Sequence, residues 1–141
     1  MNADAEKTVH YINTGLLLVA PVDLDLLVRA LAKDHLPDAA LSCLHVGQGE
    51  GVGYQAHFEA FGPEGTFDTP EESIKALLDA VERLAQSLQP LWQACTRKTL
   101  DIGYESGVTP RCVTHPISID TLARLQLLGI DLCITVYSAQ D

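Results

Sequence analysis

Positive charge is scarce in this sequence of 141 residues, which has 9 Lys and Arg against 19 Asp and Glu and a formal net charge of −10. Proteins that bind DNA, RNA or an anionic membrane surface need clustered cations to replace the counterions of phosphate groups. The charge balance therefore argues against these partners. Long apolar runs are also missing, since the longest, Leu16–Val22, is far shorter than the roughly 20 residues of a transmembrane helix.

Closely spaced cysteines are absent as well. The four cysteines, Cys43, Cys95, Cys112 and Cys133, form no Cys-x-x-Cys pair of the kind common in zinc sites and redox dithiols. Isolated cysteines behave as ordinary apolar residues in a reducing compartment. The first ten residues carry three charges and no apolar stretch, unlike a secretory signal. We therefore expect a cytoplasmic protein without a metal or cofactor.

What is present is a regular alternation of strand and helix patterns over one domain, residues 1–141, in which residues 1–7 are expected to be flexible. Alternating or β-branched residues predict strands within 9–19, 41–46, 54–61, 100–105 and 130–137. Apolar residues at helical spacing predict a helix near Leu24–Leu31, a long one from Pro70 to Trp92, and a short one between Ser118 and Gly129. Thr69-Pro70-Glu71-Glu72 is a capping sequence for the long helix, and Pro90 should kink or break its last turn.

The order β-α-β-β-α-β-α-β, with one-sided alternation in the strands, predicts a sheet covered on a single face. We expect an α+β two-layer sandwich, with a five-stranded, mostly antiparallel or mixed sheet and three helices on one face. Trp92 continues the apolar stripe of the long helix and is expected in the core.

Two local features could carry chemistry. The glycine-rich segment 47–53 joins two predicted strands, whereas a phosphate-binding loop precedes a helix, and its Glu50 would repel phosphate. It is therefore interpreted as a hairpin tip. His45 and His57 could face each other across adjacent strands, close to Cys43 and Glu59. A solvated polar pair is the simpler interpretation, and a soft-metal site is the alternative.

Acidic residues are concentrated between positions 50 and 82, where eight acids accompany one base, Lys75. The acids are Glu50, Glu59, Glu64, Asp68, Glu71, Glu72, Asp79 and Glu82. One interpretation is a solvated face that keeps the protein soluble. The other is a docking surface for a strongly basic protein, such as a nuclease or another cationic toxin, because complementary potentials steer association.

The capping sequence at Thr69 and the ending Leu125-Gln126-Leu127-Leu128-Gly129-Ile130-Asp131-Leu132-Cys133-Ile134-Thr135-Val136-Tyr137 carry a family resemblance. The chain resembles a group of small acidic bacterial α+β proteins of unknown function whose chains end in a short helix and a similar strand. That resemblance implies an immunity protein of a polymorphic-toxin or contact-dependent inhibition system. Such proteins are typically cytoplasmic and without catalytic activity.

We therefore expect a non-enzymatic, cytoplasmic binding protein, most specifically an immunity protein that neutralises a cognate basic toxin by direct occlusion. The alternative is a small-molecule-binding or regulatory α+β domain, which could form a homodimer through its open sheet face. A third hypothesis is a small enzyme that uses His45 or His57. The residues expected to contact the partner are Gln48, Glu50, Glu59, Glu64, Asp68, Glu72 and Asp79.

Overall fold

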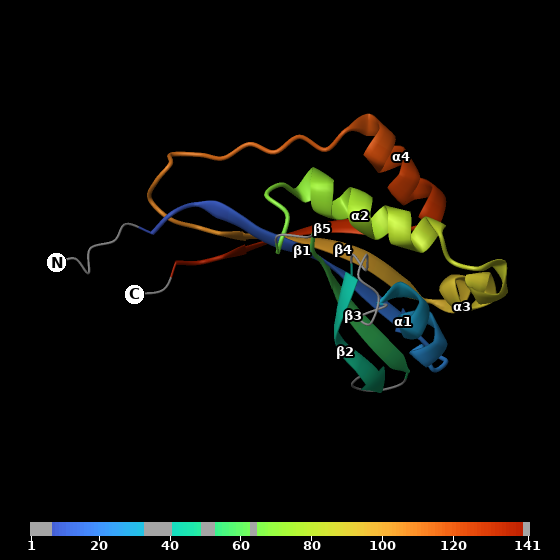
Figure 1. The fold of residues 1–141 in the computed structure, drawn as a ribbon. Helices are drawn as coiled ribbons and strands as arrows, with labels where there is room; N and C mark the ends of the chain where they lie inside the picture. Colours follow the sequence, from blue (N-terminus) through green and yellow to red (C-terminus); the bar gives the residue numbers. More distant parts are fainter. Residues whose placement is uncertain (1–6, 33–40, 49–52, 63–64, 140–141) are drawn as a thin grey trace.

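The fold is a single sheet with helices packed against it (Figure 1). The computed structural model describes residues 7–32, 41–48, 53–62 and 65–139. Within these ranges the sheet has five strands in the order β2-β3-β1-β4-β5. The elements are β1 (His10–Ala20), α1 (Asp25–Leu31), β2 (Leu41–Gln48), β3 (Tyr54–Ala60), α2 (Pro70–Glu82), the 3₁₀ helix η1 (Gln86–Leu88), α3 (Gln89–Ala94), β4 (Arg97–Glu105), α4 (Ile119–Leu128) and β5 (Asp131–Tyr137).

The connectivity explains the strand order. β1 is antiparallel to both β3 and β4, and β2 is antiparallel to β3. The first four strands with α1 and α2 therefore follow the split βαβ pattern, in which each helical connection passes over one intervening strand. A further helix, α4, then returns the chain to place β5 parallel to β4 at the sheet edge. A parallel pair needs such a crossover because a hairpin cannot join two parallel strands.

Local sequence sets the ends of α2 and α4. Thr69 caps α2 by accepting a hydrogen bond from the Glu72 amide at 3.3 Å, and its hydroxyl donates to the Glu72 carboxylate at 2.9 Å. The hydroxyl oxygen of Ser118 accepts a hydrogen bond from the Thr121 amide at 3.1 Å and caps α4 in the same way. Gly129 ends α4 in the left-handed region with φ of 71°, which a residue without Cβ adopts at little cost. These three predicted boundary signals agree with the structure.

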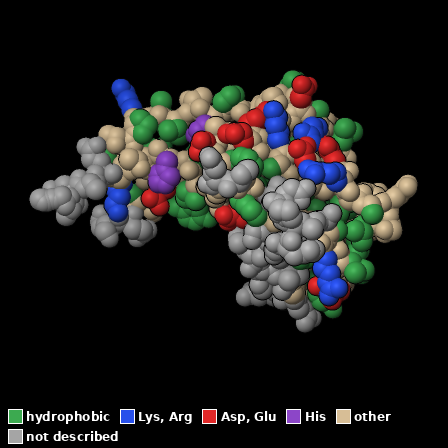
Figure 2. Space-filling view, viewed as in Figure 1, with side chains coloured by type: hydrophobic (Ala, Val, Ile, Leu, Met, Phe, Trp, Pro, Cys, Tyr) green, Lys and Arg blue, Asp and Glu red, His purple; other side chains and the backbone are tan. Residues whose placement is uncertain are grey.

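Charged side chains tie α4 to α2, and Figure 2 shows acidic and basic groups interspersed over these two helices. Arg124 of α4 donates from Nη2 to Asp79 Oδ1 and Glu82 Oε1, each at 2.7 Å, and from Nε to Glu82 Oε2 at 2.9 Å. Such a bidentate, networked guanidinium is worth more than an isolated surface ion pair. Two of the acidic residues on α2 are therefore already paired within the protein.

Replacing Arg124 by alanine should lower the free energy of unfolding by about 1 kcal/mol, because two carboxylates lose their shared cation. The loss should shrink in 1 M NaCl, which screens partly exposed charges. Urea denaturation at both salt concentrations measures this. Arg29→Ala is the matched control, since among the described residues Arg29 forms an ion pair with Asp25, four residues earlier on an exposed helix face. An equal loss in the two variants would contradict a special role for Arg124.

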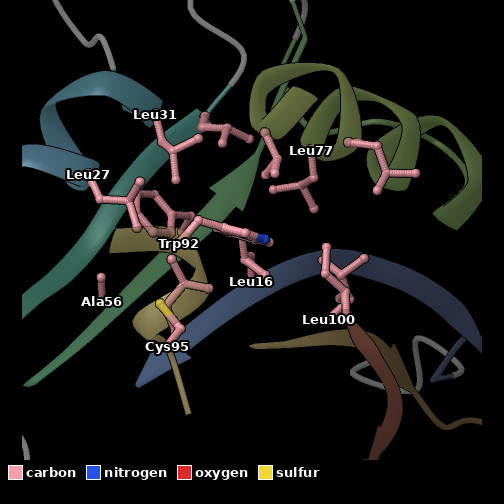
Figure 3. Close-up of a cluster of buried hydrophobic side chains, with 14 of the residues drawn as sticks. Leu16, Leu27, Leu31, Ala56, Leu77, Trp92, Cys95 and Leu100 are labelled. Carbon is pink, nitrogen blue, oxygen red and sulfur yellow. The ribbon is translucent and has the colours of Figure 1, made fainter. Parts of the chain in front are cut away.

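The core lies between the helices and one face of the sheet, and Figure 3 shows part of it. Trp92, from α3, is buried among aliphatic side chains of the strands and of α1 and α2. The strand residues that face the helices and are buried include Leu16, Leu18, Ala56, Phe58, Leu100 and Ile102. They alternate with residues of the other face, which include Leu17 and Val19 in β1 and are polar or glycine beside the named residues of β3 and β4.

The α+β class is confirmed, and two finer predictions need correction. The long helix ends at Glu82 rather than near Trp92, and the described residues hold the helices α1 to α4 and η1 rather than three helices. The break places Pro90 in the first turn of α3, where its missing N–H needs no partner. The predicted flexibility of residues 1–6 lies outside the described residues. Lys7 is described, and its carbonyl accepts a hydrogen bond from the Val108 amide at 2.8 Å, which leaves the predicted flexibility at this position untested.

Candidate functional site

The helix-free face of the sheet carries a cavity of about 410 Å³. It lies over the centre of the sheet, where β3, β1, β4 and β5 run side by side. Its lining comes from all four of these strands: Ile12, Asn13, Gly15, His57, Glu59, Asp101, Gly103 and Tyr137. Because sheet topology rather than a loop positions these groups, the arrangement is set by the strand register.

Two glycines create the hollow. Gly15 of β1 pairs with Glu59 on one side and Asp101 on the other, so no side chain lies between these two acidic residues. A Cβ atom at Gly15 would lie 3.0 Å from His57 Nε2 and 3.1 Å from the Phe58 carbonyl oxygen. Gly103 repeats the gap farther along β4. A glycine inside a strand often marks a place where another group approaches the backbone.

The cavity is acidic. Glu59 and Asp101 lie in the lining with the imidazole of His57, and the described lining residues include neither Lys nor Arg. Thr135 of β5 donates its hydroxyl hydrogen to Asp101, with Oγ1 at 2.7 Å from Oδ1 and 3.0 Å from Oδ2. That hydrogen bond orients the Asp101 carboxylate without neutralising its charge. The arrangement favours a ligand group that is positively charged and donates hydrogen bonds.

The acidic residues expected at the partner surface are divided between two sides of the sheet. Glu59 lies half-buried on the open face, whereas Glu72 and Asp79 are exposed on α2 in the helix layer. Asp68 is exposed just before α2. Gln48 is the last residue of β2 and pairs with Tyr54, and the structure does not describe its side chain.

Glu50 and Glu64 lie outside the described residues, as does most of the predicted glycine-rich tip. Among the described acids, only Glu59 of the expected set lines the open-face cavity. The structure therefore does not bring the described members of that set together at one place.

His45 and His57 are paired across β2 and β3, as predicted. The backbone register shifts between Cys43 and His45, so that Cys43 pairs with Phe58 rather than with Glu59. Side-chain positions on β2 between 42 and 46 are not described. Within the part of the chain that is described, no group of three or more His, Cys, Asp and Glu side chains could hold a metal ion.

Asn13, Asp101 and Tyr137 line the cavity although the sequence analysis did not select them. The available signal was Gly15 within an otherwise apolar strand pattern, together with Gly103 in the alternating strand that contains Asp101. These glycines predict the cavity only if the pairing of β1 with β4 is known, and that pairing joins segments about 90 residues apart in the chain.

A second polar cluster lies on the helix side of the sheet, where it connects strands to the helix layer. The Tyr11 hydroxyl is 2.7 Å from Thr14 Oγ1 and 2.6 Å from Ser73 Oγ, and the Tyr104 hydroxyl is 3.0 Å from His115 Nδ1. Burial raises the pKa of Tyr11 and of Tyr104. Both phenols therefore remain protonated at neutral pH, and they serve to join β1 and β4 to α2 and the segment before α4.

Comparison with known proteins identifies no relative: no family model, no curated protein and no solved structure matches the chain. None of the helices in the described ranges is long and apolar enough to cross a membrane. The open-face cavity is therefore interpreted from its own geometry and chemistry.

Proposed function

We propose that this protein is a non-enzymatic binding protein whose open sheet face accepts a cationic group of a basic partner protein. The observation that carries the proposal is the acidic cavity at Gly15, where Glu59 and Asp101 flank a gap in the side-chain layer. A lysine or arginine side chain of the partner has the charge and the donors that these carboxylates lack. The specific form of the proposal is an immunity protein that occludes a basic bacterial toxin.

Internal pairing favours the open face over the helix layer as the contact surface. Asp79 and Glu82 share Arg124, and Glu71 lies 3.5 Å from the Lys75 ammonium. These acids have part of their field neutralised within the protein. Glu59 and Asp101 have no Lys or Arg among their neighbours in the cavity lining, so a cation from outside gains more there.

The strong negative charge of the chain would also speed its association with a basic partner. The net charge of −10 attracts a cationic protein over distances up to about 10 Å at ordinary ionic strength and raises the association rate. A protein that blocks a toxin by occlusion has to bind it quickly and does not need a catalytic residue.

A small cationic ligand is the second candidate, and the size of the cavity supports it. About 410 Å³ lies within the range of roughly 300–1,000 Å³ typical of small-molecule sites. In this alternative the protein is a ligand-binding or regulatory domain, and the same carboxylates bind an amine or guanidinium of a metabolite.

The double variant Glu59→Gln and Asp101→Asn should lose its partner. Each substitution removes a charge while keeping an oxygen acceptor, so the side-chain amide oxygen introduced at position 101 can still accept from Thr135. We expect affinity for the basic partner to fall at least tenfold, because buried or half-buried charge contacts are worth more than about 1.4 kcal/mol each. The measurement is recovery of the partner on tagged protein from the producing bacterium, at low and raised salt, followed by binding kinetics with the purified partner.

The matched control is Asp79→Asn with Glu82→Gln, which removes the same formal charge from the helix layer. It should retain the partner with an affinity within about threefold of the unmodified protein. Equal losses in the two double variants would indicate a general charge effect and would overturn the open-face site.

A titration with arginine amide separates the two candidates. Backbone amide signals of Gly15, His57 and Gly103 should move on addition of the N-acetylated arginine amide and remain still with N-acetylnorleucine amide, which carries no charge. Shifts together with a captured basic protein support the binding-protein proposal. Shifts without any protein partner favour the small cationic ligand, and no shift at these residues overturns both.

A further inference from the structure

Large apolar side chains are exposed mainly at one edge of the sheet. Ten such side chains are exposed among the described residues, and seven of them belong to α4 and β5. These seven are Ile119, Leu122, Leu127, Leu132, Ile134, Val136 and Tyr137. Leu132, Ile134 and Val136 share the helix side of β5, and clustered apolar side chains of this kind commonly mark an interaction site.

β5 is an edge strand without the usual protection. It pairs with β4 on one side and ends the strand order on the other, so its outer backbone groups face away from the sheet. Natural edge strands are commonly protected by lysine, proline or a bulge. β5 contains neither lysine nor proline, its pairing with β4 runs without a register shift, and its single charge is Asp131.

The helix side of β5 is apolar but largely uncovered. Ile134 is 64% and Val136 62% exposed, although their neighbours on β4, Ile102 and Tyr104, pack into the core. The sequence alternation predicted a buried face here, and that prediction is wrong for these two residues because α4 does not extend over them. Burial by another chain would remove this surface from water.

We propose that β5 forms a homodimer by pairing with β5 of a second copy. The two strands run antiparallel about a two-fold axis at Ile134, so Ile134 of each copy faces Ile134 of the other. In this register Leu132 faces Val136, Cys133 faces Thr135 and Asp131 faces Tyr137. The sheet then continues from one copy into the next.

The register is self-complementary, which is why a second copy fits this edge. Each residue on the helix side meets an apolar residue, and no two like charges are opposite each other. The carboxylate of Asp131 meets a tyrosine hydroxyl, which can donate a hydrogen bond to it. A two-fold interface requires this property, because the same patch must match itself.

α4 enlarges the contact beyond the strand. A specific interface buries about 800 Å² on each partner, which is more than one strand edge supplies. Arg124 faces α2, and Leu122 lies about 200° around the helix from it, on the side away from α2. Ile119 shares that side with Leu122, and both are exposed. Both side chains are therefore available to a second copy on the side of α4 that faces away from α2.

Sedimentation velocity of the full chain between about 5 and 200 µM tests the dimer. We expect a species of twice the 15.3 kDa chain mass, with a dimer fraction that rises with salt because both copies are strongly acidic. Ile134→Lys should be monomeric throughout, since two ammonium groups would face each other at the axis. Leu26→Lys, at an equally exposed apolar position on α1, should remain dimeric.

Because Ile134 and Leu26 are both exposed, the two lysine variants should keep the circular dichroism spectrum of the unmodified chain. A chain that stays monomeric at the highest concentration overturns the proposal. A dimer that survives Ile134→Lys with its spectrum intact overturns it as well.

Crosslinking tests the register. With Cys112 and Cys133 replaced by serine, Ile134→Cys should give a disulfide-linked dimer under mild oxidation, since directly opposed residues lie within disulfide range. Leu127→Cys in the same background is the control, because this residue is 86% exposed on another side of α4 and should not crosslink. Equal crosslinking of the two variants contradicts the antiparallel pairing at Ile134.

Discussion

Replacing Trp92 by alanine should lower the free energy of unfolding by about 3–5 kcal/mol, the usual range for removing a large buried aromatic side chain. Trp92 is the single tryptophan of the chain and is 4% exposed. The substitution leaves a cavity at the meeting point of α3, the sheet and α1, which the surrounding strands cannot fill. Urea denaturation followed by circular dichroism measures the loss, since the tryptophan fluorescence disappears with the residue.

Trp92 also makes two directional contacts. Its Nε1–H donates to the carbonyl of Leu128 at 3.2 Å, at the end of α4, and the Lys98 ammonium lies 5.4 Å from the ring centroid. The short helix α3 therefore holds the C-terminal end of α4 as well as filling the core. A cation over an indole face adds a smaller contribution.

Trp92→Phe separates packing from hydrogen bonding. Phenylalanine keeps an aromatic ring in the site but leaves the Leu128 carbonyl without its donor, so we expect a loss of about 1–2 kcal/mol. A loss below about 1 kcal/mol in Trp92→Ala would contradict the assignment of this residue to the core. Equal losses in the two variants would show that the hydrogen bond, not the volume, dominates.

Helix boundaries were predictable where a signal is local. Thr69, Ser118 and Gly129 act within one turn of their own helices, so the chain carries each boundary in a few adjacent residues. The end of α2 at Glu82 was not predictable in this way. Apolar residues keep the helical period past this point, and the break becomes clear only because Trp92 packs into the core from a separate helix.

The periodicity of the sequence could not predict which part of the sheet the helices cover, nor the register in which the strands pair. The alternation in β5 indicates which residues share a face of the strand, but it does not indicate whether a helix covers that face. Ile134, for example, remains exposed. The open-face cavity depends on Gly15 being placed between Glu59 and Asp101. Those two acids are far from Gly15 in sequence, so only the tertiary pairing brings them together.

Glu71 connects α2 with the start of α4. Its Oε1 accepts a hydrogen bond from the Ser118 amide and its Oε2 accepts one from the Thr121 hydroxyl, both at 3.1 Å. The Lys75 ammonium lies 3.5 Å from Oε2. The Glu71 carboxylate thus accepts hydrogen bonds from Ser118, the N-cap residue of α4 that lies 47 positions later in the chain, and from Thr121 in the first turn of α4. Partial burial raises the pKa of Glu71, but these hydrogen bonds outweigh it and hold the pKa below its usual range.

Glu71→Ala should therefore destabilise the fold by about 2 kcal/mol at neutral pH, because two hydrogen bonds to a charged acceptor are lost. The pH dependence follows from the depressed pKa: the stabilisation is complete above the unfolded-state pKa of about 4.3 and is lost as the pH falls through the lower folded-state value. The difference in unfolding free energy between the unmodified protein and Glu71→Ala should thus be constant from about pH 7 to about 5.5 and shrink below it. Glu72→Gln, which removes an adjacent charge that accepts a hydrogen bond from the cap residue Thr69 of the same helix, should cost less than about 1 kcal/mol. Urea denaturation across this pH range decides the matter, since a Glu71→Ala difference that persists unchanged at about pH 3 would mean that the carboxylate charge does not hold α4 in place.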